Sequence, residues 1–289
     1  MRKSELNSYK LVPLTTAILA ATLAGCAATP RAYYSEESRA LNLARADGIY
    51  DMDLRDSEDG TRSYSKGMLV PLLDLASLAT SFDAPLRHLS GTQTFLFNAA
   101  DIMVTPDKPS ARPSLMGWMP ASMAGSEMQA HEQYVALVDQ AIEKVSSDMG
   151  LTAAKLGDVK APEIDGHPLI LWSIESDEYG CGVGQCVVVY NIQHPNQWKT
   201  PGYVIGGEAA GSYNIAANHP EEYSRLVFLQ SGHDPAFPTD EFYGAVSAAM
   251  PPWMVMYFPP NTVIRDGEPV PYPVLYEQGI QLMFKEPQS

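Results

Sequence analysis

A chain of 289 residues with 45% hydrophobic side chains has enough apolar material for a sizeable core, which excludes a chain that is disordered throughout. Its formal net charge of −15 at pH 7 repels phosphate backbones, so the composition argues against nucleic-acid binding and favours basic protein partners.

The N-terminus has the zones of an export leader in the usual order. Arg2, Lys3 and Lys10 give a positively charged start, and an apolar stretch follows at 11–23. This stretch is shorter than the roughly 20 residues that a helix needs to cross a bilayer. We therefore interpret residues 1–25 as a signal peptide and not as a membrane span.

The leader ends in Leu23-Ala24-Gly25-Cys26, which resembles the lipobox of bacterial lipoproteins. The resemblance implies cleavage before Cys26, lipid transfer to its thiol and acylation of the new amine. Residue 27 is Ala rather than Asp, which resembles the signal that sends Gram-negative lipoproteins to the outer membrane. Two acyl chains already anchor a protein stably, so the resemblance implies a lipid-anchored protein of the outer membrane that faces the periplasm.

The first half of the remaining chain has mainly helical patterns. Residues 26–35 are small and polar and predict a lipidated tether that reaches at most about 30 Å. The pattern then predicts a mainly helical region at 36–155. Glu36 and Glu37 suit a first helical turn, and a second helix is expected at about 67–82.

The strongest helix prediction covers residues 126–149. Ser126 and Gln129 form a capping-box pattern, and Gly150 provides a stop. One helical face carries an apolar stripe made of Tyr134, Val138, Ala141, Ile142, Val145 and Met149.

From residue 160 the pattern changes, and we expect an α+β region at 160–289. Runs at 169–174 and 187–192 predict a hairpin. Further strands are expected at 203–205, 253–258, 274–276 and 280–284, with helices starting near Asn218 and near Thr239 or Asp240. The expected fold class is therefore α+β, with a helical N-terminal half and a small, disulfide-pinned, mixed β/α C-terminal half.

Cys181 and Cys186 form an even pair around a glycine-rich loop, which favours a disulfide in an oxidising compartment. The bond would close a small loop and pin the tip of the hairpin. One alternative is a zinc site that recruits His194, but no fourth ligand lies at a spacing typical of zinc sites. The other is a nucleophilic Cys186, but a strand pattern follows this residue, whereas reactive thiolates usually lie at a helix N-terminus or near cations.

The other candidate motifs are incomplete. His131-Glu132 begins the zinc-peptidase pattern HExxH, but Val135 occupies the second histidine position, so a core histidine is favoured. Ser231-Gly232-His233-Asp234 holds the residue types of a hydrolase triad without the geometry of one. The acidic run near Asp56 lacks the glycine of a calcium loop and predicts a solvated loop.

Methionines form the one unusual pattern. Residues 113–125 mix Pro, Trp and Met without helical or strand periodicity, which favours a protruding apolar loop for a partner or a membrane interface. Thioethers also select Cu(I), although methionine more often fills gaps in a core. The candidate partner loop contains Met116, Trp118, Met119 and Met123, and a later cluster contains Met250, Met254 and Met256.

We predict no catalytic residue, cofactor or metal from these motifs. The expected function is that of a scaffold or assembly component of envelope machinery, such as a secretion or conjugation apparatus, with the lipid on Cys26 in the membrane and envelope proteins as partners. One alternative is a periplasmic hydrolase or cell-wall enzyme with a dispersed triad that uses His219 or His233. A second is a soft-metal, copper-binding lipoprotein.

Overall fold

The computed structural model divides the chain between Pro30 and Arg31, and every described residue belongs to the second unit, Arg31–Ser289. The predicted signal peptide, Cys26, and the helices expected at 67–82 and near Asn218 lie outside the described residues. The structure describes residues 32–50, 52–61, 108–160, 168–208, 211–215, 223–230 and 236–287.

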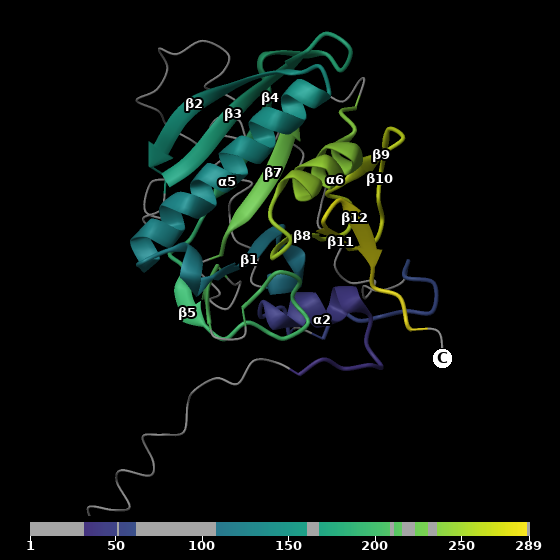
Figure 1. The fold of residues 1–289 in the computed structure, drawn as a ribbon. Helices are drawn as coiled ribbons and strands as arrows, with labels where there is room; N and C mark the ends of the chain where they lie inside the picture. Colours follow the sequence, from purple (N-terminus) through teal and green to yellow (C-terminus); the bar gives the residue numbers. More distant parts are fainter. Residues whose placement is uncertain are drawn as a thin grey trace, which may run out of the picture. The chain divides into compact units, whose positions relative to one another are not determined.

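Two antiparallel sheets organise this unit (Figure 1). The larger one has the strand order β12-β11-β8-β1-β6-β5, and the smaller one has the order β2-β3-β4-β7. The strands of the larger sheet are β1 (Ser114–Pro120), β5 (Asn196–Trp198), β6 (Ser212–Asn214), β8 (Met254–Phe258), β11 (Val274–Glu277) and β12 (Ile280–Met283). The smaller sheet contains β2 (Thr152–Lys160), β3 (Pro168–Ser176), β4 (Cys181–Asn191) and β7 (Arg225–Gln230), while β9 (Ile264–Arg265) and β10 (Glu268–Pro269) pair separately.

The described part of the chain is mostly β, so the predicted α+β class with a helical N-terminal half is wrong. The region expected to be mainly helical supplies β1, which lies in the middle of the larger sheet, and the start of β2, which lies at an edge of the smaller one. Both faces of β1 are buried, so its sequence shows no alternation of polar and apolar residues. The described helices are α2 (Arg39–Ala46), α5 (Glu127–Asp148), α6 (Thr239–Ala249) and two short 3₁₀ turns, η1 (Pro109–Ala111) and η2 (Ala121–Met123).

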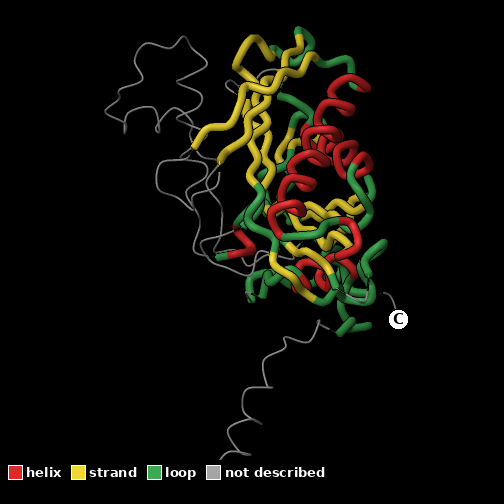
Figure 2. Tube along the Cα trace, turned by 60° about the vertical axis from the view of Figure 1, so that its left-hand side comes forward, coloured by secondary structure: helices red, strands yellow, loops and turns green. Residues whose placement is uncertain are grey.

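Helix α5 confirms the prediction for 126–149. The Ser126 side chain accepts from the backbone N–H of Gln129 at 3.2 Å, and Gly150 follows the helix with φ +70°. The predicted stripe is buried from Tyr134 to Val145, while Met149 is partly buried. Figures 1 and 2 show α5 running along one face of the smaller sheet.

A single carboxylate ties α5 to this sheet. Asp139 accepts hydrogen bonds from the Trp172 indole at 2.8 Å and from the Tyr190 hydroxyl at 2.6 Å. It also pairs with Lys155 at 2.9 Å, so one helical residue contacts β2, β3 and β4. These bonds fix the rotation of the helix that carries His131.

The hairpin predicted from 169–174 and 187–192 is confirmed as β3 and β4. The strands predicted at 253–258, 274–276 and 280–284 are also confirmed, as β8, β11 and β12. The strand predicted at 203–205 is wrong, because these residues form turns after β5. Gln278 and Gly279 join β11 to β12 with φ +50° and +80°, a turn that a glycine makes accessible.

Helix α6 is confirmed, but neither Thr239 nor Asp240 caps it. Pro238 occupies the cap position without a side-chain hydrogen bond. Thr239 instead accepts from the backbone N–H of Ile264 at 2.7 Å, and Asp240 binds Arg265 at 2.6 Å. Both expected caps therefore connect α6 to β9.

Candidate functional site

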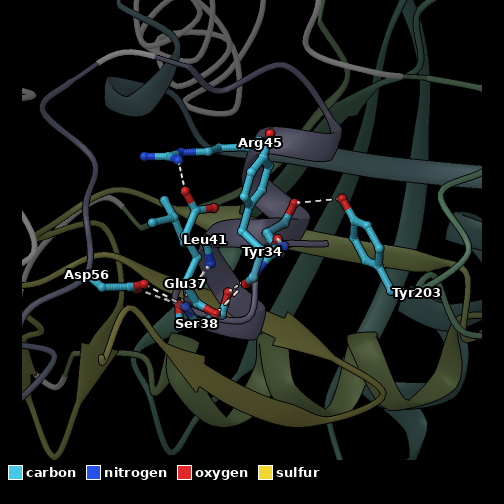
Figure 3. A network of polar contacts seen from close by, with 8 residues as sticks. Tyr34, Glu37, Ser38, Leu41, Arg45, Asp56 and Tyr203 are labelled. Atoms are coloured by element: carbon cyan, nitrogen blue, oxygen red, sulfur yellow. Dashed lines mark hydrogen bonds and ion pairs between the residues drawn. The ribbon is translucent and has the colours of Figure 1, made fainter. Parts of the chain in front are cut away.

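Helix α2 begins at Arg39, shortly after the predicted tether of residues 26–35, and its first turn is fixed by a carboxylate from the following loop (Figure 3). The Ser38 hydroxyl accepts from the Leu41 N–H at 3.0 Å and donates to Asp56 at 2.5 Å. The Ser38 N–H donates to the second Asp56 oxygen at 2.6 Å. Hydrogen bonds to a carboxylate are stronger than neutral ones, so the start of α2 is held firmly. Asp56 was expected only as part of a solvated acidic loop.

Asn42, which is fully buried, joins α2 to the residues before it. Its side chain accepts from the Tyr34 N–H at 2.9 Å and donates to the carbonyls of Tyr34, Glu37 and Ser38 at 2.9 to 3.2 Å. The Tyr203 hydroxyl donates to the Asn42 carbonyl at 3.2 Å (Figure 3). The chain therefore has a fixed shape from Tyr34 into α2.

Ion pairs complete this attachment. Arg39 binds the carboxylate of Glu277 on β11 through two nitrogens, and its guanidinium also donates to the Tyr203 carbonyl at 3.3 Å. The hydrogen bond to Glu277 raises the pKa of Arg39 above its ordinary value, against the effect of burial. Arg45 pairs with Glu37 within the segment. We call the set Ser38, Arg39, Asn42, Asp56, Tyr203 and Glu277 the α2 attachment site.

Large apolar side chains are exposed beside this attachment. Tyr33 is 50% exposed and Tyr34 is 42% exposed before α2, while Tyr50 and Met52 after it are 62% and 94% exposed. The Tyr33 ring contacts the Tyr203 ring edge-on with centroids 5.4 Å apart. Aromatic side chains with a polar tip are common in binding surfaces, so the two flanks of α2 are candidates for contact with another molecule.

The predicted partner loop is wrong for three of its four residues. Met116, Trp118 and Met119 are fully buried on β1, where Trp118 pairs with Asn214 of β6. The missing periodicity reflects a strand with two covered faces and not a protruding loop. Only Met123, which is 43% exposed at the end of η2, lies at the surface.

Two methionines of each cluster lie on neighbouring strands, Met116 and Met119 on β1 and Met254 and Met256 on β8. The register of β1 and β8 pairs Gly117 with Met254 and Met116 with Val255. Paired residues share a face, so Met116 points to the face opposite Met254, whereas Met119, two residues beyond Gly117, shares the face of Met254. All three are fully buried in the main hydrophobic cluster, which is the packing that methionine suits as a gap-filler.

The predicted disulfide between Cys181 and Cys186 is present, with Cα atoms 5.2 Å apart. Its position differs from the prediction, because the hairpin turn precedes Cys181 and both cysteines belong to β4. Cys181 pairs with Ser176 and Cys186 with Ile174, so four residues of β4 bulge opposite one residue of β3. The disulfide thus closes a bulge inside a strand.

Histidines give a second candidate cluster. His131 is half-buried rather than a core residue, and its ring lies 5.4 Å from that of His194, centroid to centroid. His219, His233 and Ser231, on which the hydrolase alternative depends, lie outside the described residues. Among the residues that the structure describes, no three His, Cys, Asp or Glu side chains gather as metal ligands, and no helix is long and apolar enough to cross a membrane.

Comparison with known proteins identifies no relative of this chain. No protein-family model, no curated protein and no solved structure matches the chain. The functional argument therefore depends on the chain's own residues.

Proposed function

We propose that this protein is an outer-membrane lipoprotein, anchored through Cys26 and facing the periplasm, whose body is a scaffold or assembly component of envelope machinery of the secretion or conjugation type. The leader 1–25 and the Leu23 to Cys26 pattern support the anchor. The disulfide between Cys181 and Cys186 is in keeping with an oxidising compartment.

The observation that carries the proposal is the α2 attachment site. Only seven residues separate Cys26 from Tyr34, where the fixed shape begins, so the body can move at most about 30 Å from its anchor. Bonds from Ser38 and Arg39 then fix this exit point to Asp56 and Glu277. A short tether that enters a rigid body restricts both the distance and the orientation of that body, which is the property that an assembly component needs.

The same region supplies the partner surface of the proposal. Tyr34, Tyr50 and Met52 present apolar area on a chain whose net charge is −15. Such a surface suits an envelope protein that is basic around an apolar contact, because opposite charge speeds encounter and burial of the apolar side chains holds the complex.

Site-specific photocrosslinking in cells tests this surface. A photoreactive amino acid at Met52, which is 94% exposed, should capture an envelope protein that mass spectrometry identifies. The matched control carries the same amino acid at Leu156, which is 45% exposed on the distant strand β2. Equal capture at both positions, or capture at neither, would contradict the proposed surface.

A Cys26→Ser variant tests the role of the anchor in the same experiment. Cys26→Ser removes the thiol on which the lipid would be built, so capture at Met52 should fall when the body is no longer held at the membrane. Unchanged capture with Cys26→Ser would show that the partner does not depend on the anchor.

A further inference from the structure

His131 and His194 bring two imidazoles together at the surface from elements that are far apart in the sequence. His131 lies on the second turn of α5, and His194 lies just after β4. Their ring centroids are 5.4 Å apart, and the ring planes are inclined by 51°. His194 is exposed and His131 is half-buried, so an ion from solvent has access to the pair.

A backbone carbonyl sets the tautomer of His131. The Nε2 atom lies 3.1 Å from the Ile192 oxygen, and because a carbonyl only accepts, Nε2 carries the hydrogen and donates it. In the neutral ring Nδ1 then carries the lone pair. Histidines that bind metals typically donate their other N–H to a carbonyl or carboxylate in this way.

The spacing of the two rings suits a shared ion. A metal–nitrogen bond of about 2.0–2.1 Å places each ring centroid about 3 Å from the ion, and a tetrahedral angle then separates the centroids by about 5 Å. The observed 5.4 Å agrees with this value.

We propose that His131 and His194 form a two-histidine site for a divalent transition-metal ion, with water at the remaining positions and Cu²⁺ the most tightly bound of the series. Imidazole is a ligand for copper and zinc alike, and affinity along this series is greatest for Cu²⁺. Water in the remaining positions makes the ion exchangeable, unlike the four-ligand sites that hold a fold together. This site differs from the zinc site considered for Cys181 and Cys186, which are joined to each other.

Titration of the purified full chain with Cu²⁺ and, separately, Zn²⁺ in a non-coordinating buffer tests the site. Isothermal calorimetry should give one ion per chain with tighter binding of Cu²⁺, and electron paramagnetic resonance should show imidazole nitrogen coupled to that Cu²⁺. His194→Ala should lose this binding. His131→Gln should also lose it, while its amide N–H keeps a donor for the Ile192 carbonyl.

Lys144→Ala is the control, since it replaces an exposed side chain of α5 that lies more than three turns beyond His131. It should bind Cu²⁺ like the unaltered chain. Absence of a stoichiometric Cu²⁺ site in the unaltered chain, retention of that site in His194→Ala, or its loss in Lys144→Ala would each overturn the proposal. Circular dichroism shows whether the two site variants are folded. A folded variant that still binds Cu²⁺ with imidazole coupling would count against the proposed site.

Discussion

Replacement of Trp118 by alanine separates the buried strand seen in the structure from the partner loop expected from the sequence. Trp118 is fully buried on β1, with the larger sheet extending on both sides of this strand. Truncation of a buried tryptophan to alanine costs about 3–5 kcal/mol, because it removes apolar burial and leaves a cavity. For a body of this size each kcal/mol lowers the melting temperature by about 2–4 °C, so Trp118→Ala should lower it by about 10 °C.

Met123→Ala is the control from the same stretch of sequence. Met123 is 43% exposed, so its loss should change the free energy of unfolding by no more than about 0.5 kcal/mol. Differential scanning calorimetry and urea denaturation of both variants measure the contrast. A Trp118→Ala variant that melts like Met123→Ala would refute the buried-strand account of residues 114–120.

Three further predictions concern single contacts. Ser38→Ala removes the cap of α2 and a donor to Asp56, and should cost about 1 kcal/mol in urea denaturation, whereas an unchanged midpoint would count against the attachment site. Burial raises the pKa of Asp240, but the hydrogen bonds from Arg265 and Tyr276 lower it by more, so the net pKa is below its ordinary value. The ionised carboxylate therefore stabilises the fold above about pH 4, and this stabilisation is lost as the pH falls through the folded-state pKa. Asp240→Asn should therefore flatten the acid limb of melting temperature against pH, and an unaltered limb would contradict this. Replacement of both bulge cysteines by serine should cost about 2 kcal/mol, the entropy of a small loop, and no loss would show that the bulge is held by its other contacts.

Local signals predicted the elements in which cap, stripe and stop agree. Ser126 and Gly150 bracket α5, and the apolar stripe between them follows one face. The β11–β12 hairpin was predictable for the same reason, since two apolar runs flank Gln278 and Gly279. In both cases residues close in the sequence carry all the information.

Strand β1 was missed because its environment is set by distant residues. Met119 pairs with Tyr213, and Leu115 pairs with Met256, more than ninety residues away in each case. A strand covered on both faces shows no alternation, and no local pattern separates it from an apolar loop. Strand β2 was missed because its alanine, glycine and lysine residues have low strand propensity.

The candidate sites were likewise predictable only where residues close in the sequence carry the signal. The disulfide was predictable from the even pair of cysteines and the expected oxidising compartment, whereas its position inside β4 was not predictable. The pair of His131 and His194 depends on α5 packing over the end of β4, a tertiary contact that sequence spacing does not reveal. Asp56 became a partner of Ser38 for the same reason.

Intact-mass measurement of the protein extracted from isolated outer membranes tests the central claim most directly. The account predicts a chain that begins at Cys26 and carries the added mass of a diacylglyceryl group and an N-acyl chain. Cys26→Ser should yield the unprocessed precursor without lipid. A chain that begins elsewhere, or a Cys26 that carries no lipid, would contradict the anchor and the function built on it.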